Sequence, residues 1–282
     1  MNEAKPAAKP RRIWLCADDY GLSPAVGAAI RDLIAHGRIN ATSVMVLAPS
    51  FSPSEAAALD TAAAKRAAIG LHVTLTAPFR PLSAGFAPTR DGAFLPLAAM
   101  AGRALVHWLR PEDLELEMSR QFAAFQAAFG RAPDFVDGHQ HIHVFPQIRT
   151  TLLRVIKDAA PAAWLRQCGR PAAARKSLAD PKGFVLDALS AHLRRLAAQY
   201  GVRTNPAFAG TYSFAPDADF ARLFPGFLDG LPDGGVVMCH PGKVDAELRR
   251  LDPVTDLRQR EYDYFLGEDF PRLLENRGLT LA

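Results

Sequence analysis

The sequence predicts an irregular (β/α) barrel of about seven strands in a single domain, and two observations point to it. Short apolar segments of strand character alternate with amphipathic helices along most of the 282 residues, an order that pairs strands in parallel through right-handed crossovers. No Gly-x-Gly-x-x-Gly motif follows the first strand, which disfavours a doubly wound dinucleotide-binding sheet. The domain is expected to span residues 12–282, after a disordered tail of residues 1–11 that is rich in Ala, Pro and Lys.

Each element is predicted by its spacing of apolar residues and by the residues that start or stop it. Ser23 is a good N-cap and Pro24 fits the first position of a helix, whereas Gly130 ends the most regular helix of the chain. We expect strands at residues 12–17, 42–47, 69–74, 135–139, 163–167 and 236–239. We expect helices at residues 24–36, 54–68, 112–129, 147–159, 184–200 and 255–276. Residues 77–110, with a turn signal at Asp91-Gly92, are expected to be an insertion rather than a regular unit.

The composition is that of an ordinary globular protein. Hydrophobic residues make up 49% and charged residues 22%, and a chain of this length buries a large core without disulfides. The formal net charge of +4 is mildly basic, but no stripe of basic residues interleaved with aromatic residues is present. We therefore expect no nucleic-acid partner.

Cysteine usage and hydropathy bear on the location of the protein. Cys16, Cys168 and Cys239 have no close pairing and lie in or beside apolar runs, where a free thiol acts as a small buried hydrophobe. This pattern favours a reducing compartment. The N-terminus lacks the apolar core of a signal peptide, and no uncharged apolar run is long enough for a transmembrane segment. The expected location is the cytoplasm.

Residue types used in catalysis stand at the ends of five predicted strands. Active sites of (β/α) barrels lie at the C-terminal ends of their strands, so these positions should meet. They are Asp18-Asp19, His72, the segment Asp137–His143, Arg166 and His240. Their recurrence at successive strand ends indicates one shared site.

The Asp18-Asp19 pair can be interpreted in two ways. A lone Asp in this position is usually a turn or helix cap. Adjacent residues of an extended chain point to opposite sides, so two carboxylates can divide roles only if the backbone turns between them. One could then bind a cation while the other stays free as a base.

The histidines favour a metal site. A single histidine between apolar neighbours, as His72 is, is more often a hydrogen-bonded core residue than a ligand. In Asp137-Gly-His139-Gln-His141-Ile-His143, however, an extended backbone would direct four titratable side chains to one face. Such a face, if buried, needs a cation or a polar network; the alternative is a solvated edge strand. The spacing does not say which histidines bind the ion and which support its ligands or face a substrate.

Histidine nitrogens together with one carboxylate form the open, catalytic type of metal site. Zinc suits this ligand set better than magnesium, which prefers oxygen ligands. Such an ion polarises a carbonyl oxygen and lowers the pKa of water to about 7. A neighbouring carboxylate can then accept a proton, and a histidine can donate one to a departing amine.

Four segments that occur in order between residues 12 and 245 together resemble the YdjC-like family of carbohydrate deacetylases. They are Ala17-Asp-Asp-Tyr-Gly-Leu-Ser-Pro24, Gly70-Leu-His72, Asp137-Gly-His139-Gln-His141-Ile-His143 and Met238-Cys-His-Pro241. The resemblance implies a barrel related to other polysaccharide deacetylases, one zinc or magnesium ion, and removal of N-acetyl groups from amino sugars. The Asp-Gly-His-Gln-His form is closer to the chitooligosaccharide branch than to the hopanoid-associated branch.

The resemblance also implies roles for individual residues, carried over by position. The implied metal ligands are Asp19, His72 and His139. The implied catalytic residues are Asp18 as general base, His240 as general acid, and Arg166, which would orient Asp18. The residues expected to face the substrate are Tyr20, His141 and His143. At Tyr20 the family usually has Phe, so only a hydroxyl is added.

Two other functions and the role of the insertion remain open. A metal-dependent phosphoesterase or another amidohydrolase would keep the ion, although phosphoryl chemistry often uses two ions with bridging carboxylates, for which few acidic candidates stand near the histidines. A non-catalytic sugar-binding barrel would need neither Asp18 nor His240. Residues 77–110 follow a strand that carries a predicted ligand, and could contact the sugar or a partner subunit of a homodimer, or could form a solvated loop.

Overall fold

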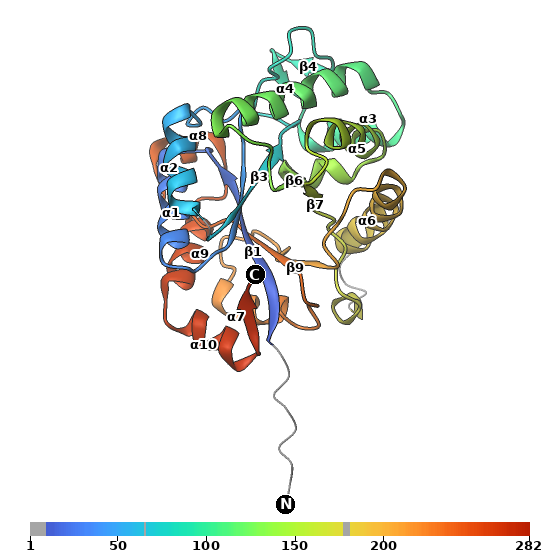
Figure 1. Ribbon diagram of the computed structural model, residues 1–282. Helices are drawn as coiled ribbons and strands as arrows, with labels where there is room; N and C mark the ends of the chain where they lie inside the picture. Colours follow the sequence, from blue (N-terminus) through green and yellow to red (C-terminus); the bar gives the residue numbers. More distant parts are fainter. Residues whose placement is uncertain (1–9, 65, 177–180) are drawn as a thin grey trace, which may run out of the picture.

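The computed structural model describes residues 10–64, 66–176 and 181–282 (Figure 1). Within these residues, eight parallel strands form one curved sheet, and the helices lie around its outside. The strands of this sheet are β1 (Arg11–Tyr20), β2 (Ala41–Val44), β3 (Ala68–Val73), β6 (Phe135–Gly138), β7 (Trp164–Leu165), β8 (Phe208–Ala209), β9 (Gly235–Cys239) and β10 (Leu279–Leu281). A separate hairpin consists of β4 (Thr89–Arg90) and β5 (Ala93–Phe94).

The order of neighbouring strands shows that the sheet curls into a barrel. It runs β7-β6-β3-β2-β1-β9-β8, and β10 pairs with the first residues of β1. The two ends of this order approach each other near β7. Thr204 forms an isolated parallel bridge with Leu165, and the N–H of Phe208 donates to the carbonyl of Gly169. The contact that closes the barrel between β7 and β8 is therefore short and irregular. The predicted irregular (β/α) barrel is confirmed.

The helices pack the hydrophobic core against the outside of the sheet. They are α1 (Pro24–Ala35), α2 (Pro53–Ala63), α3 (Leu97–Leu105), α4 (Pro111–Phe129), α5 (Pro146–Ala159), α6 (Pro181–Tyr200), α7 (Phe220–Phe227), α8 (Ala246–Leu251), α9 (Asp256–Leu266) and α10 (Asp269–Asn276). As predicted, α1 begins after Ser23, whose side chain accepts a hydrogen bond from the N–H of Val26. Its residues Val26, Ile30 and Leu33 are buried in the core. Among the described residues, no helix is both long and apolar enough to cross a membrane.

Several element boundaries differ from the sequence prediction. The predicted helix over 255–276 is two helices, because the chain leaves helical geometry at Gly267 before α10 begins. The predicted strand at 42–47 ends at Val44, and the predicted helix at 54–68 ends at Ala63. The sequence pattern misses β8, β10, α7 and α8, which are too short to show a period. The predicted tail falls mostly outside the described residues and is wrong at Arg11, which already pairs in β1.

The insertion at 77–110 has regular structure of its own. The predicted turn at Asp91-Gly92 joins β4 to β5, and both turn residues have positive φ. Helix α3 follows the hairpin and leads into α4. Near the start of the insertion, the ring of Phe79 packs edge-on against the ring of His139, with 5.8 Å between the centroids. The insertion therefore begins beside the predicted site.

Two buried polar residues of α4 fix the base of this insertion. The carboxylate of Glu117 accepts hydrogen bonds from the N–H groups of Leu82 and Ser83. Gln121 bonds to both the N–H and the carbonyl of Thr74, two residues after His72. A buried backbone without a partner would be costly, so these side chains determine how the chain leaves β3.

Candidate metal centre

The C-terminal ends of the strands bring the predicted site residues together. Asp19 lies near the end of β1, His72 lies in β3, and His139 follows β6 directly. Asp137 of β6 pairs in register with His72, and Ser43 of β2, the strand between β1 and β3, lies 3.0 Å from Nδ1 of His72. Parallel strands thus place side chains from distant parts of the sequence at one point.

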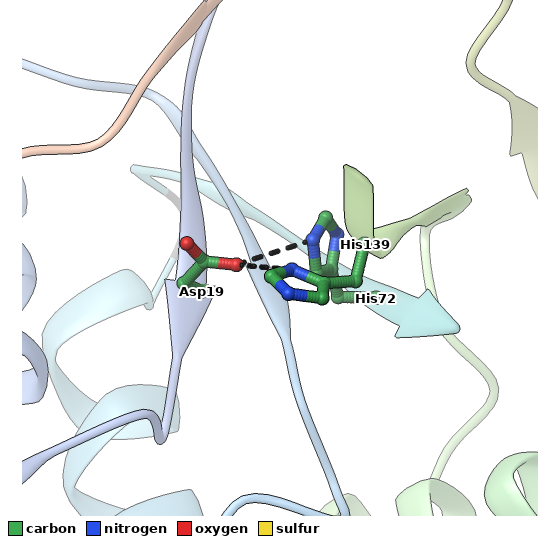
Figure 2. A group of neighbouring side chains, drawn as sticks. All are labelled: Asp19, His72 and His139. Atoms are coloured by element: carbon green, nitrogen blue, oxygen red, sulfur yellow. Dashed lines mark hydrogen bonds and ion pairs between the residues drawn. The ribbon is translucent and has the colours of Figure 1, made fainter. Parts of the chain in front are cut away.

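Asp19, His72 and His139 point toward one another (Figure 2). Oδ1 of Asp19 lies 3.0 Å from Nδ1 of His139 and 3.3 Å from Nε2 of His72. One donor atom from each residue lies within 4.8 Å of the other two. Asp19 and His72 are buried and the side chain of His139 is 13% exposed, so the group is shielded from water on most sides.

The two adjacent aspartates point apart because the backbone turns between them. Asp19 has φ +68°, in the left-handed region that Asp tolerates better than most residues. The pairing of β1 with β2 shifts register between Ala17 and Tyr20, across this turn. Asp19 therefore reaches the histidines, whereas Asp18 reaches Arg166.

Arg166 holds both carboxylate oxygens of Asp18. Its Nη1 donates to Oδ2 and its Nη2 to Oδ1, both at 2.6 Å, and neither side chain is more than 2% exposed. Burial alone would raise the pKa of Asp18, but the charge and hydrogen bonds of Arg166 outweigh burial and hold this pKa well below its ordinary value. Asp18 is therefore ionised at neutral pH, and its orientation is fixed.

Asp137 fixes the imidazole of His72. Nδ1 of His72 donates to Oδ1 of Asp137 over 2.6 Å, which leaves Nε2 directed at Asp19. A carboxylate in this position sets the tautomer of a metal-binding histidine. Burial lowers the pKa of His72, but the charge and hydrogen bond of Asp137 outweigh burial and raise it to about 10. The carboxylates around His72 therefore favour a positive charge at this position.

The second oxygen of Asp19 is held by Arg258, to which no sequence motif points. Nη2 of Arg258 donates to Oδ2 of Asp19 at 2.6 Å and to Asp252 at 2.5 Å. Arg258 belongs to α9 and is 2% exposed. Because Oδ2 is occupied, Oδ1 is the oxygen of Asp19 that faces the two histidines.

The buried ionic network has a charge that one divalent cation would balance. Four carboxylates are joined to two guanidinium groups, so the formal charge is −2 once His72 has released its proton, as a metal-binding imidazole must. These groups are Asp18, Asp19, Asp137, Asp252, Arg166 and Arg258. A buried charge without compensation is costly, and two imidazoles with one carboxylate form a recognised donor set for a divalent ion. The residues present therefore fit one divalent cation at Asp19, His72 and His139.

A second cluster of potential ligands contains its own cation. Cys16, Asp18 and Asp137 also lie within metal-binding distance of one another. Nη2 of Arg166 lies between them, 2.9 Å from the Cys16 sulfur and 2.6 Å from an oxygen of each carboxylate. Burial raises the pKa of the Cys16 thiol, so it stays protonated. The guanidinium takes the place that a metal would need.

His240 follows β9 and lies on the Oδ2 side of Asp19, with 4.0 Å between Nε2 and this oxygen. Burial lowers the pKa of its imidazole. Its backbone N–H donates to the carboxylate of Glu261 at 2.5 Å, and Glu261 also accepts a hydrogen bond from the hydroxyl of Tyr212 at 2.7 Å. Burial raises the pKa of Glu261 to about 7. Helix α9 therefore holds Asp19 through Arg258 and His240 through Glu261, and sequence reasoning missed both contacts.

The prediction that Asp137, His139, His141 and His143 share one extended face is wrong. Strand β6 ends at Gly138, and His139–Val144 form 3-10 turns in which Gln140 and His141 have positive φ. The backbone turns because the sheet ends there, and the side chains spread in different directions.

His143 and His141 consequently occupy different environments. His143 is fully buried, and its Nε2 donates to the carbonyl of Arg166, so the structure leaves it unable to face a substrate as expected. The ring of His141 is half-buried, packs edge-on against Phe208, and places Nδ1 3.6 Å from the sulfur of Cys168. Burial lowers the pKa of His141 to about 3, so it is neutral.

Tyr20 does not face the site either. Its side chain is fully buried, and its hydroxyl donates to Glu55 of α2 and accepts a hydrogen bond from Arg31 of α1. Asp19 turns toward the histidines, so the next residue points away from them, toward the helices. Tyr20 is therefore not placed to contact a substrate in this structure, contrary to the expectation.

The whole chain is similar to known proteins. Residues 12–276 match the family described as YdjC-like protein. Two chitooligosaccharide deacetylases, from Citrobacter koseri and Serratia marcescens, are each 28% identical to the chain, over 96% and 94% of its length and 92% and 95% of theirs. A crystal structure of an Enterococcus faecalis protein, whose name refers to cellobiose-phosphate cleavage, matches with a TM-score of 0.72 and 21% identity over 97% of both chains.

The fold and the site together define a class of protein: an irregular (β/α) barrel with an aspartate and two histidines grouped at its strand ends. Within that class, the chain belongs to the YdjC-like family, as the four sequence motifs predict.

Proposed function

We propose that this protein is a metal-dependent deacetylase that removes N-acetyl groups from amino sugars of the chitooligosaccharide type. The observation that carries the proposal is the grouping of Asp19, His72 and His139, whose donor atoms lie within 4.8 Å of one another beside the ionised Asp18. Two relatives that align over nearly the whole chain are named chitooligosaccharide deacetylases, which supports this substrate class.

The metal in this proposal is one divalent ion held by Asp19, His72 and His139. Two imidazole nitrogens favour zinc over magnesium, which binds oxygen ligands. When bound, the ion supplies Lewis acidity to an amide carbonyl and lowers the pKa of a water molecule toward about 7. Asp137 and Arg258 hold two of the three ligands in place through the bonds described above.

Asp18 and His240 carry the proton transfers in this proposal. Asp18 is ionised and oriented by Arg166, so it can accept a proton from the attacking water. His240, next to Asp19, donates a proton to the amine nitrogen as the amide bond breaks. Burial lowers the pKa of His240, so only the fraction of the imidazole that carries a proton can act as this acid.

We also propose that the chain from residue 12 to residue 282 acts as one domain and works in the cytoplasm. The single curved sheet, which includes strands from both ends of this range, supports one domain. The three cysteines are buried and free, which supports a reducing compartment.

The test is acetate release from N-acetylglucosamine, N,N′-diacetylchitobiose and N,N′,N″-triacetylchitotriose, together with metal analysis of the purified protein. We expect acetate from at least one sugar and about one divalent ion per chain. The variant His72→Ala should lose both acetate release and the bound ion. The matched control His36→Ala, at the exposed C-terminal end of α1, should keep both. Folded, metal-loaded protein that releases phosphate from sugar phosphates but no acetate would favour the phosphoesterase alternative.

A further inference from the structure

The loop after β8 places an exposed aromatic ring beside His240. Phe214 packs edge-on against the imidazole of His240, with 5.4 Å between the ring centroids and 80° between the planes. The side chain of Phe214 is 38% exposed, and its ring lies 4.5 Å from that of the half-buried Tyr212. This loop follows the C-terminal end of a strand, as the residues of the metal centre do.

The base of the loop is held tightly against β9. Gly210 has φ +103°, and a Cβ atom there would lie 2.1 Å from the carbonyl oxygen of Met238. Only glycine fits this approach, because any side chain would displace either the loop or the strand that leads to His240. The start of the loop and His240 therefore have a fixed relationship.

Tyr212 fixes the middle of the loop. Its hydroxyl donates to the buried carboxylate of Glu261, which also binds the backbone N–H of His240. Its ring contacts the rings of Phe220 and Phe227 in α7. Phe214 is therefore an exposed ring two residues beyond Tyr212, on a loop that is tied to His240 through the shared carboxylate of Glu261.

We propose that Phe214 is a carbohydrate-binding platform, on which the apolar C–H face of a pyranose ring packs with its amide directed to the metal centre. This inference rests on the proposed function and deepens it. An isolated exposed phenylalanine needs no explanation. An exposed ring that contacts the predicted proton donor, and that is held by two anchors, offers an apolar surface with little conformational entropy left to lose on binding. The C–H groups of a sugar match the negative face of such a ring, whereas its hydroxyl groups do not.

The variant Phe214→Ala tests this proposal against a matched control. With N,N′-diacetylchitobiose we expect KM to rise about tenfold while kcat changes less than about threefold. Phe214→Tyr should restore KM, and Phe214→Leu, which keeps apolar bulk without a ring, should not. Phe184→Ala is the control, because Phe184 on α6 has a similar exposed fraction, 37%, and is not placed beside His240. An unchanged KM in Phe214→Ala, or an equal rise in Phe184→Ala, would overturn the proposal.

A binding measurement separates failure of this proposal from failure of the proposed function. The affinity of Asp18→Asn for N,N′-diacetylchitobiose is measured by calorimetry, with and without Phe214→Ala. A tenfold loss of affinity supports the platform even if the wild-type protein releases no acetate. Equal affinities overturn the platform even if the wild-type protein is an active deacetylase. Metal content, which a platform would not affect, should be the same in both variants.

Discussion

Asp18 and Asp19 are neighbours in sequence but belong to different environments. Each is buried and each pairs with a buried arginine. Arg166 takes both oxygens of Asp18, whereas Arg258 takes one oxygen of Asp19 and leaves the other for His72 and His139. The same residue type is thus paired with a guanidinium through both oxygens in one position, and in the next it keeps one oxygen directed at two imidazoles.

The difference shows that the role of a buried carboxylate depends on how many of its oxygens the protein occupies. A left-handed backbone at Asp19 separates the two side chains, and two arginines from different elements complete the separation. Both arginines are buried, so water screens their charges only weakly. Substitutions at the two aspartates and their partners should therefore have separable effects.

The largest effect is expected for Asp19→Asn. The amide loses the negative charge of a ligand, so affinity for a divalent ion should fall by more than about 100-fold, and acetate release should fall with it. Asn tolerates left-handed φ, so the backbone at this position should be retained. Competition with a chelating indicator measures the affinity; binding as tight as in the wild-type protein would show that Asp19 is not a ligand.

For Asp18→Asn we expect metal binding to be retained and catalysis to be lost. Metal affinity should stay within about threefold of the wild-type value, while kcat for acetate release falls by roughly 10²- to 10⁴-fold, as when a general base is removed. Metal content and single-turnover acetate release, measured on one preparation, check the expected metal affinity and the expected loss of kcat. Full activity in this variant would contradict the base assignment.

The next largest effects are expected when either buried arginine is replaced, and they are losses of folding stability. Arg166→Met leaves Asp18 and Asp137 buried without their shared cation, and we expect a loss of about 3–5 kcal/mol in the free energy of unfolding. Arg258→Met should cost less, because the side chain of Asp252 is 17% exposed and can be hydrated. Urea denaturation measures both losses, and the reverse ranking would contradict this account of the two pairs.

Glu261, on the same helix as Arg258, should give a smaller and pH-dependent effect. Burial raises its pKa to about 7 in the folded protein, above the ordinary value of 4.5. The protonated form therefore stabilises the fold below pH 4.5, and this contribution is lost as the pH rises through 7, in total on the order of 3 kcal/mol. Glu261→Gln lacks this titration, so its stability relative to the wild-type protein should increase between pH 5 and pH 8. A difference that is constant over this range would show that Glu261 does not titrate there.

The smallest effect is expected for Tyr20→Phe. The hydroxyl bonds only to Glu55 and Arg31, so its loss should cost about 1 kcal/mol of stability and leave kcat and KM unchanged. Thermal unfolding and sugar kinetics test this together. A changed KM would restore Tyr20 as a residue that faces the substrate.

The sequence could predict the site residues at the ends of the strands, but not the helix residues that pack against them. Asp19, His72 and His139 stand at strand ends and in recognisable motifs, and the structure brings them together. Arg258 and Glu261 lie in a helix rich in charged residues, where nothing distinguishes a buried charge from a solvated one. Their importance depends on which face of α9 meets the barrel, and tertiary packing determines this.

The spread of the histidines after β6 could not be read from spacing either. A period of two describes a strand only while the chain stays extended, and here the chain turns after Gly138, at Gln140 and His141. A Cβ at this glycine would lie 2.9 Å from Nδ1 of His143, so the turn folds the last histidine back over the strand end. The glycine between Asp137 and His139 is the only local sign of this turn.

The central place of β1 has a consequence for the order in which the protein is made. β1 pairs on one side with β2, but its other neighbours, β9 and β10, come from the last fifth of the chain. Arg258 likewise reaches Asp19 across 239 positions of sequence. A nascent chain therefore contains Asp19 long before β9 and Arg258, which surround it, have been made. Under the proposed function, the ion would bind to a nearly finished barrel, and N-terminal fragments should bind it poorly.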